Sequence, residues 1–222
     1  MSRAPRVVSV LLRLLGGVLA LVVLVYLVVN AVMTVQAQQR RGEVADRVSA
    51  RLEQALPASA DRQQDLLALV DSEPDARWVE QHCDFSSDDA GWMVQAYRQT
   101  CSVRGLVAWQ VESAREAEDL LAVEGQEEAA YDGCRRLGTV DDAEAYAVDA
   151  SAAEGEPWCS GAAAGSSRDL VGERVALDPG QWLLLVDEQP LVDEPIGCVR
   201  WSVLFCDNPF GDRPAFGEAP AS

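Results

Sequence analysis

Residues 14–35 read LLGGVLALVVLVYLVVNAVMTV, a stretch without a charged side chain that decides the organisation of the chain. As an α-helix, at 1.5 Å per residue, it is about 33 Å long and can cross a hydrocarbon core of about 30 Å. A helix also satisfies its backbone polar groups internally, which lipid requires. The long side chain of Arg13 can reach the head groups. We therefore predict one transmembrane helix over Leu14–Val35, in contact with membrane lipid.

A cleaved secretory signal is the main alternative for this stretch. Basic residues precede it, and Val35-Gln36-Ala37 resembles a small-residue cleavage site. The apolar run is longer than the core of a typical signal, which favours a retained anchor preceded by a short cytoplasmic tail over 1–13. A lipoprotein is excluded, because the first cysteine is Cys83.

The two sides of the span differ in charge. Residues 1–41 contain no acid, so the other 181 residues carry all 36 acids and 13 of the 18 basic residues, a formal charge of −23. Such a surface repels a phosphate backbone, which excludes nucleic acid as a partner. No glycine-rich phosphate loop follows a predicted strand, so we expect no nucleotide either. The absence of lysine and the single isoleucine indicate the codon bias of a GC-rich bacterium.

All six cysteines lie beyond the span, and an even number of cysteines there predicts three disulfides in an oxidising compartment. They are Cys83, Cys101, Cys134, Cys159, Cys198 and Cys206. This places the N-terminus in the cytoplasm and the C-terminal domain outside, since arginines flank the span on both sides and do not orient it. A cytosolic zinc site is the alternative, but the chain has no Cys-x-x-Cys and its only histidine is His82.

The segment from Cys198 to Cys206 contains no turn residue and predicts a strand. Its eight residue steps span about 26 Å in extended form, whereas bridged Cα atoms lie within about 7 Å. We therefore predict that Cys198 and Cys206 are not bonded to each other. The other disulfide connectivities stay open.

Residues 36–73 predict a juxtamembrane helical stalk. Apolar residues recur every four positions before Pro57, which is expected to end the helix, and a second short helix is expected over 61–71. The stripe consists of Val44, Val48, Leu52 and Leu56. We interpret the stalk as a solvated spacer, because one or two heptads are too few for a coiled coil.

Residues 74–209 predict an extracytoplasmic α+β domain, mostly antiparallel, with one or two helices. Ser113-Ala-Arg-Glu116 has the spelling of a capping box and predicts a helix to about Val123. Turns are predicted at 104–105 and 178–180, a long loop at 151–172, and a disordered tail at 210–222. The predicted strands are Trp78–Phe85, Trp92–Val103, Leu106–Glu112, Ala143–Asp149, Arg174–Leu177, Gln181–Asp187 and Cys198–Cys206.

The inventory of reactive side chains is narrow, and we predict no catalytic, metal-binding or cofactor-binding residue. Without lysine there is no Schiff base or Ser-Lys chemistry, and any histidine-dependent mechanism would have to use His82, beside a cysteine expected to be bonded. The tightest acidic clusters lack the spacing of a calcium loop and are interpreted as solvated charge. They are Asp84 with Asp88 and Asp89, and Asp141 with Asp142 and Glu144.

These features favour a single-pass protein of the bacterial cell envelope whose non-enzymatic domain interacts with another envelope or membrane protein. Trp158 is the aromatic side chain that we expect at a partner contact. The alternative is an envelope hydrolase that uses paired carboxylates, which a cleft with two converging acids would favour. A third hypothesis is a signalling accessory that self-associates through its 44–56 helix.

Overall fold

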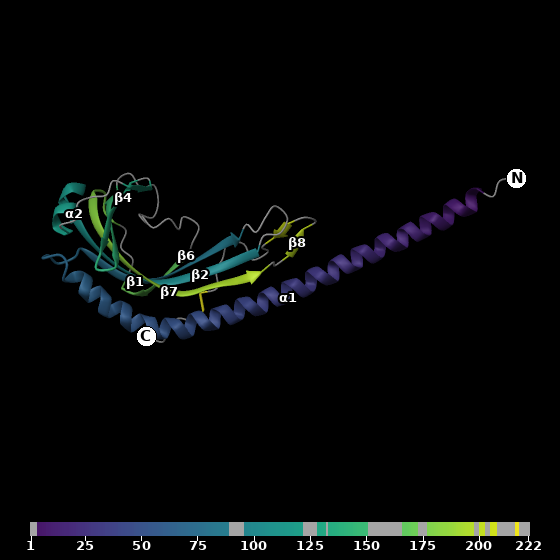
Figure 1. The fold of residues 1–222 in the computed structure, drawn as a ribbon, viewed down its shortest axis with the longest axis horizontal. Helices are drawn as coiled ribbons and strands as arrows, with labels where there is room; N and C mark the ends of the chain where they lie inside the picture. Colours follow the sequence, from purple (N-terminus) through teal and green to yellow (C-terminus); the bar gives the residue numbers. More distant parts are fainter. Residues whose placement is uncertain are drawn as a thin grey trace.

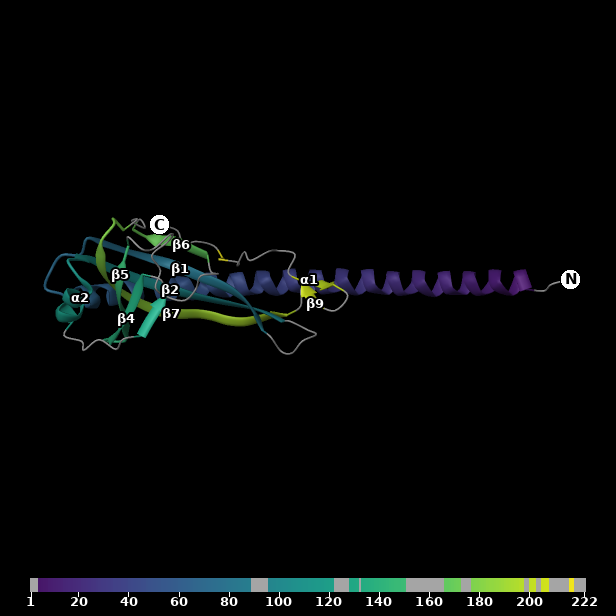
Figure 2. The same ribbon diagram turned by 90° about the horizontal axis from the view of Figure 1, so that it is seen from above.

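The computed structural model describes residues 4–88, 96–121, 128–131, 133–150, 166–172, 177–197, 200–202, 205–207 and 216–217. One long helix, α1 (Ala4–Leu67), lies along a curved seven-stranded sheet with its C-terminal half, and its N-terminal half projects away from the sheet (Figures 1 and 2). A short helix, α2 (Ala114–Leu121), lies at the end of the sheet far from the N-terminus (Figure 1). The predicted α+β class is confirmed.

The sheet has the order β3-β4-β5-β7-β2-β1-β6, and all its paired strands are antiparallel. The strands are β1 (Ala76–Asp88), β2 (Ala96–Val111), β3 (Glu128–Tyr131), β4 (Cys134–Val140), β5 (Ala143–Asp149), β6 (Ser166–Val171) and β7 (Gln181–Gly197). The late strand β7 lies between β5 and β2, so the centre of the sheet depends on contacts between residues far apart in the sequence. A separate hairpin consists of β8 (Arg200–Ser202) and β9 (Phe205–Asp207).

The N-terminal half of α1 exposes its apolar side chains. The leucines, valines and Tyr26 from Leu12 to Val35 are 39–71 % exposed, and α1 is long and apolar enough to cross a membrane. Water is a poor solvent for such a surface, whereas lipid is a good one. The predicted span, Leu14–Val35, lies in this helix without a break. The structure therefore supports a membrane anchor.

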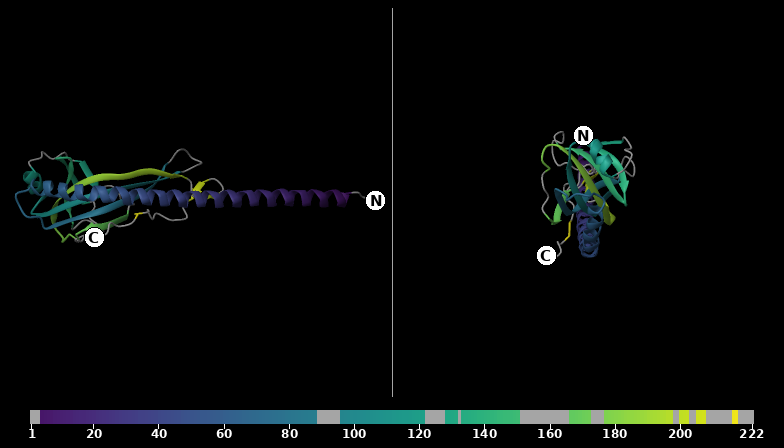
Figure 3. Two further views of the ribbon diagram at one scale, coloured as in Figure 1. Left: turned by 90° about the horizontal axis from the view of Figure 1, so that it is seen from below. Right: turned by 90° about the vertical axis from the view of Figure 1, so that its left-hand side faces the viewer.

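The C-terminal half of α1 is a core element and not a solvated stalk. Val44, Val48 and Leu52 are at most 1 % exposed, and Figure 3 shows α1 lying lengthwise along one face of the sheet. Their partners are Val79, Cys83, Cys101, Val103, Leu191 and Val192. Because this face of the helix is buried against its own sheet, it cannot also pair with a second copy. The interpretation as a solvated spacer is therefore wrong, and the Val44, Val48 and Leu52 stripe is not available for self-association.

Helix α1 also continues through Pro57, where the sequence predicted a break and a separate helix over 61–71. Proline inside a helix removes a hydrogen bond and crowds the preceding turn, at a cost of about 3 kcal/mol. Leu52 and Leu66, before and after it, are fully buried against the sheet, and each contributes about 1.5–3 kcal/mol. Packing on both sides therefore offsets the proline, and α1 curves along the sheet in this half (Figure 1).

Gly105 lies in the middle of β2, where the sequence predicted a turn between two strands. A Cβ atom at this position would lie 3.2 Å from the hydroxyl oxygen of Ser59 on α1. Glycine in a strand often marks such a close approach of another element. Gly105 therefore allows α1 to pack closely on β2.

Strand β7 extends past its predicted end at Asp187, through Pro190 and Pro195. Proline cannot donate to a sheet ladder and is tolerated on a strand with one free edge. In the described chain, β5 pairs only with 181–186 of β7, so the proline-containing part pairs on one side only, with β2. The prolines therefore fit a strand here.

Residues 151–172 were predicted as a loop, but their end forms β6, which pairs with β1; residues 151–165 lie outside the described residues. The predicted strand over 198–206 is also wrong, since the chain doubles back as β8 and β9 and pairs Trp201 with Cys206. Chain length therefore no longer excludes a Cys198–Cys206 bond. The predicted disordered tail contains an ordered pair, Phe216 and Gly217, that contacts the domain.

Four shorter predictions have different outcomes. The helix after Ser113 is confirmed, and Ser113 Oγ accepts the Glu116 N–H at 3.2 Å, as in a capping box. The strand over Ala143–Asp149 is confirmed with the predicted bounds. The predicted turn at 178–180 lies directly before β7, with a bend at 179–180 and a φ of +151° at Gly180. The strand over 174–177 cannot be compared, because residues 173–176 lie outside the described residues.

Leu52→Ala is expected to lower the free energy of unfolding by about 2–5 kcal/mol, because it leaves a cavity between α1 and the sheet. The matched control is Glu53→Ala, an exposed position on the same helix, which should change the free energy by less than about 0.5 kcal/mol. Denaturant unfolding of the detergent-solubilised protein, followed by tryptophan fluorescence, measures both. Equal, small effects would show that α1 is not part of the core.

Candidate functional site

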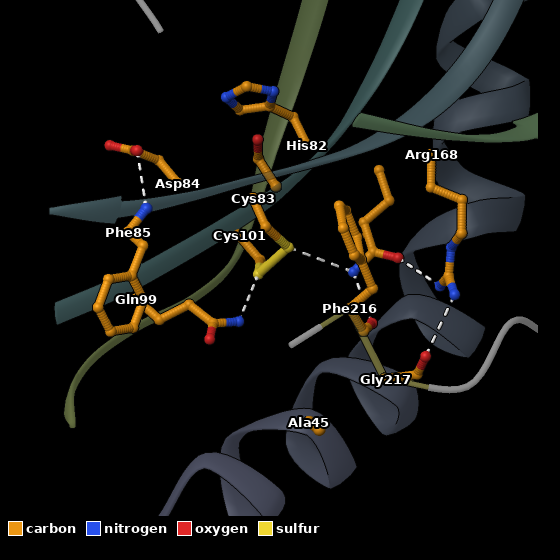
Figure 4. Close-up of a disulfide and its surroundings, with 12 residues drawn as sticks. Ala45, His82, Cys83, Asp84, Phe85, Gln99, Cys101, Arg168, Phe216 and Gly217 are labelled. Atoms are coloured by element: carbon orange, nitrogen blue, oxygen red, sulfur yellow. Dashed lines mark hydrogen bonds between the residues drawn. A yellow bond between two sulfur atoms is a disulfide. The ribbon is translucent and has the colours of Figure 1, made fainter. Parts of the chain in front are cut away.

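The sheet face that points away from α1 carries a group of largely buried polar side chains, here called the polar cluster. Successive strand residues point to opposite faces, so in β1 Cys83 faces α1 while Glu80 and His82 point away from it. Figure 4 shows the imidazole of His82 on the opposite side of β1 from the disulfide. The polar cluster consists of Glu80, His82, Ser102, Arg104, Ser167 and Glu188.

Strand register brings the polar cluster together in two neighbouring rows. In one row Ser167, His82 and Ser102 lie opposite one another on β6, β1 and β2. In the other row Glu80, Arg104 and Glu188 lie opposite one another on β1, β2 and β7. Directly opposite residues have Cβ atoms about 5 Å apart. The sequence could not reveal the cluster, because its members come from four strands and meet only through sheet pairing.

One half of the polar cluster is an ion pair between the buried Arg104 and Glu188, whose side chain is 43 % exposed. Arg104 is 6 % exposed, and its Nη2 atom donates to Glu188 Oε1 at 3.1 Å. The same oxygen accepts the hydroxyl proton of Ser102 at 2.5 Å. A charge this deeply buried is stable only when it is paired and hydrogen-bonded. Glu188 therefore holds Arg104 and Ser102 in place.

The other half joins His82 to Glu80 through Ser167. Ser167 donates to Glu80 Oε1 at 3.3 Å, and its hydroxyl oxygen lies 3.0 Å from His82 Nδ1. With the single Ser167 proton on Glu80, the neutral His82 ring donates from Nδ1 to Ser167 and carries its lone pair at Nε2. Nε2 of His82 and Nε of Arg104 are buried without a hydrogen-bond partner. The cluster thus offers one unused acceptor and one unused donor.

The charge state of His82 follows from its surroundings. Burial lowers the pKa of His82, and the positive charge of Arg104 acts in the same direction. The carboxylates of Glu80, Glu188 and Asp84 oppose this shift but do not reverse it. The imidazole is therefore neutral at pH 7, in agreement with its role as an acceptor at Nε2.

The arrangement differs from a serine hydrolase site. In a Ser-His-acid triad the imidazole lies between the other two groups and takes the serine proton. Here Ser167 lies between His82 and Glu80 and is within hydrogen-bond distance of both. This order suits a site that positions a polar group more than one that activates a nucleophile. In the described part of the chain, no group of three or more His, Cys, Asp or Glu residues is arranged to hold a metal ion.

The acidic cluster at 141–144 has structural partners. Asp141 and Asp142 have positive φ angles of 48° and 67°, which suit the tight turn between β4 and β5. The carbonyl oxygen of Asp141 accepts Arg62 Nη2 of α1 at 2.5 Å. Glu144 accepts Arg136 Nη2 at 2.7 Å and also accepts the hydroxyl of Tyr146. Burial and then this hydrogen bond raise the pKa of Tyr146.

A shallow depression of about 490 Å³ lies where α1 joins β1, and two acids, Glu73 and Asp75, line it. Asp75 Oδ2 accepts the main-chain N–H of Gln110 at 2.7 Å, which ties it to β2. One of the two acids is therefore engaged in the fold.

One predicted disulfide is complete within the described residues. Cys83 and Cys101 lie opposite each other on β1 and β2, with Cα atoms 4.1 Å apart, and are bonded. Cys134 on β4 is also disulfide-bonded, and its partner is not among the described side chains. Cys159, Cys198 and the expected contact residue Trp158 lie outside the described residues, and so does the side chain of Cys206.

Comparisons of the chain with protein-family models, curated proteins and solved structures give no match. Function is therefore inferred from the helix, the disulfide and the polar cluster.

The folded protein is expected to lose stability as the pH falls below about 6.5. Unfolded His82 takes up a proton near pH 6.5, whereas folded His82 does so only at lower pH. Its contribution is therefore complete above pH 6.5 and declines as the pH falls through the folded pKa. His82→Asn should remove this part of the slope.

Because the chain has one histidine, NMR titration of the imidazole proton resonances measures the pKa of His82 without assignment. Denaturant unfolding midpoints of wild type and His82→Asn between pH 5 and 7 measure how the free energy of unfolding changes with pH. A folded pKa at or above 6.5 would contradict the account.

Proposed function

We propose that this chain is a single-pass protein of the bacterial cell envelope, with its N-terminus in the cytoplasm and a non-enzymatic domain, stapled by three disulfides, outside the membrane. The domain binds another envelope or membrane protein. The observation that carries the proposal is that one helix supplies both the apolar span and a core element of the domain. The Cys83–Cys101 bond supports an oxidising compartment.

The position of the domain limits its partners. Ala37, two residues past the apolar stretch, is already buried with Phe85 and Ile196. The packed part of α1 from Ala37 to Leu66 is about 45 Å long at 1.5 Å per residue. The domain therefore starts at the bilayer surface and cannot swing on a linker. A partner must therefore come within about 45 Å of the membrane surface, the length of the packed part of α1.

Arginines just past the span hold this orientation. Arg40 Nη1 donates to the carbonyl oxygen of Ile196 at 3.4 Å, and Arg51 donates to that of Leu191. Arg47 pairs with Glu194. All three acceptors belong to β7, so a partner that moves the sheet also moves the anchor.

The polar cluster provides the chemistry for partner recognition in this proposal. A buried polar atom without a partner costs about 1–3 kcal/mol, a cost that a bound group can remove. A group with one donor and one acceptor, such as a main-chain amide, matches His82 Nε2 and Arg104 Nε; because both atoms are buried, the partner must displace the residues that cover them. Trp158 remains the proposed aromatic contact.

The test is affinity capture of the intact protein from solubilised native membranes after cross-linking in cells. Wild type and Arg115→Gln, an exposed position on α2, are expected to recover the same membrane protein. His82→Asn combined with Arg104→Gln should reduce its recovery at least fivefold. Equal recovery by all variants would contradict recognition through the polar cluster.

Topology is tested separately in whole cells. External protease is expected to digest the acidic domain, and mass spectrometry under non-reducing conditions should find six bonded cysteines. A protected domain, or six free thiols, would contradict the extracytoplasmic placement.

A further inference from the structure

Phe216 and Gly217, near the C-terminus, lie beside α1, β1 and β6 on the α1 side of the sheet (Figure 4). Residues from three separate parts of the chain contact this pair. They contact its main chain and its aromatic ring, and α1 lies close to the Cα atom of its glycine. The site has no role in the anchor or in the polar cluster, and the inference below does not depend on the proposed function.

Two side chains bind the main chain of the pair. Gln81 Nε2 donates to the carbonyl oxygen of Phe216 at 2.8 Å, and Arg168 Nη1 donates to that of Gly217 at 3.1 Å. Arg168 Nη2 also donates to Gln81 Oε1 at 2.5 Å, so the two side chains fix each other. Because both contacts are to carbonyl oxygens, they recognise the peptide main chain independently of its side chains.

The aromatic residue and the glycine supply selectivity. The guanidinium of Arg168 lies 5.5 Å from the centre of the Phe216 ring, within the range of a cation–π contact, and Phe216 packs against the core cluster beneath α1. Gly217 has a φ of +76°, and a Cβ atom there would lie 2.6 Å from the carbonyl oxygen of Ala45 and 2.5 Å from Ser49 Oγ. The site therefore accepts glycine and no larger residue.

The receptor side is held by the domain itself. Gln81 is fully buried, and its Nε2 atom lies 3.5 Å from Cys83 Sγ of the disulfide. Arg168 lies opposite Gln81 on β6, where sheet pairing fixes it. The contacts to Phe216 and Gly217 come from side chains and not from a strand ladder. The pair can thus leave without breaking a strand pairing of the described sheet.

We propose that Ala45, Ser49, Gln81 and Arg168 form a binding site for a peptide containing Phe-Gly, and that Phe216 and Gly217 are its resident, displaceable occupants. This pair, here called the strap, joins α1, β1 and β6. When the pair leaves, the same site accepts a Phe-Gly peptide supplied from outside.

The test measures binding of a fluorescent peptide with the sequence of residues 213–221, RPAFGEAPA, to the protein in detergent. Three forms are compared: the full chain, a chain ending at Pro209, and the full chain with Gly217→Val. The shortened chain is expected to bind the peptide saturably and at least tenfold more tightly than the full chain. Gly217→Val should bind it like the shortened chain, because the added side chain expels the strap.

Control peptides test selectivity. A scrambled peptide of the same composition and a peptide with Val in place of Gly217 should not bind, and Arg168→Gln in the shortened chain should weaken binding at least tenfold. Equal binding to the full and shortened chains would overturn the proposal. Absence of peptide binding to the Gly217→Val variant would also overturn the proposal. This variant keeps the full length of the chain, so it tests the proposal even if the shortened chain does not fold.

Discussion

The burial of one face of α1 against the sheet is the contact on which the rest of the structure depends. Val48 and Leu52 fill the space beneath β1, β2 and β7, and Leu66 joins the cluster that includes α2. Without this helix the same sheet face would expose its apolar side chains to water. The domain is therefore completed by a segment that continues directly into the apolar span. Anchor and domain form one mechanical unit.

The two faces of the sheet divide the remaining tasks. On the face toward α1, the disulfide and Gln81 lie among apolar residues and support the site of Phe216. On the opposite face, Trp78, Leu106 and their neighbours form an apolar cluster next to the polar cluster. Buried polar groups in such surroundings are costly unless they are paired. Because of that cost, the unpaired atoms His82 Nε2 and Arg104 Nε mark the polar cluster as a candidate binding site.

The sequence predicted features that depend on local composition. The apolar span, the cap at Ser113 and the strand Ala143–Asp149 each carry their signal within a few residues. Prediction from the sequence failed where packing against a distant element overrides the local preference of a residue. Pro57 stays helical because leucines on both sides are buried, and Gly105 stays in a strand because α1 approaches it closely.

The packing of residues 44–52 on the sheet, the polar cluster and the contacts of Phe216 and Gly217 were not predicted, for a related reason. Periodicity shows that Val44, Val48 and Leu52 share a helix face, but not what covers that face. The polar cluster joins residues from 80 to 188 through sheet register alone. In the C-terminal tail, no pattern around Phe216 marks it as a ligand for Gln81 and Arg168. Pairing between distant segments cannot be read from one sequence.

Hydrogen exchange of the full chain in lipid nanodiscs tests the shared helix most directly. If α1 belongs to the core, the amides of residues 44–66 will be protected to the same degree as those in the centres of β2 and β7, and they will lose protection together with the sheet when denaturant is added. Exchange of residues 44–66 at the rate of an isolated solvated helix, with the sheet still protected, would contradict the account.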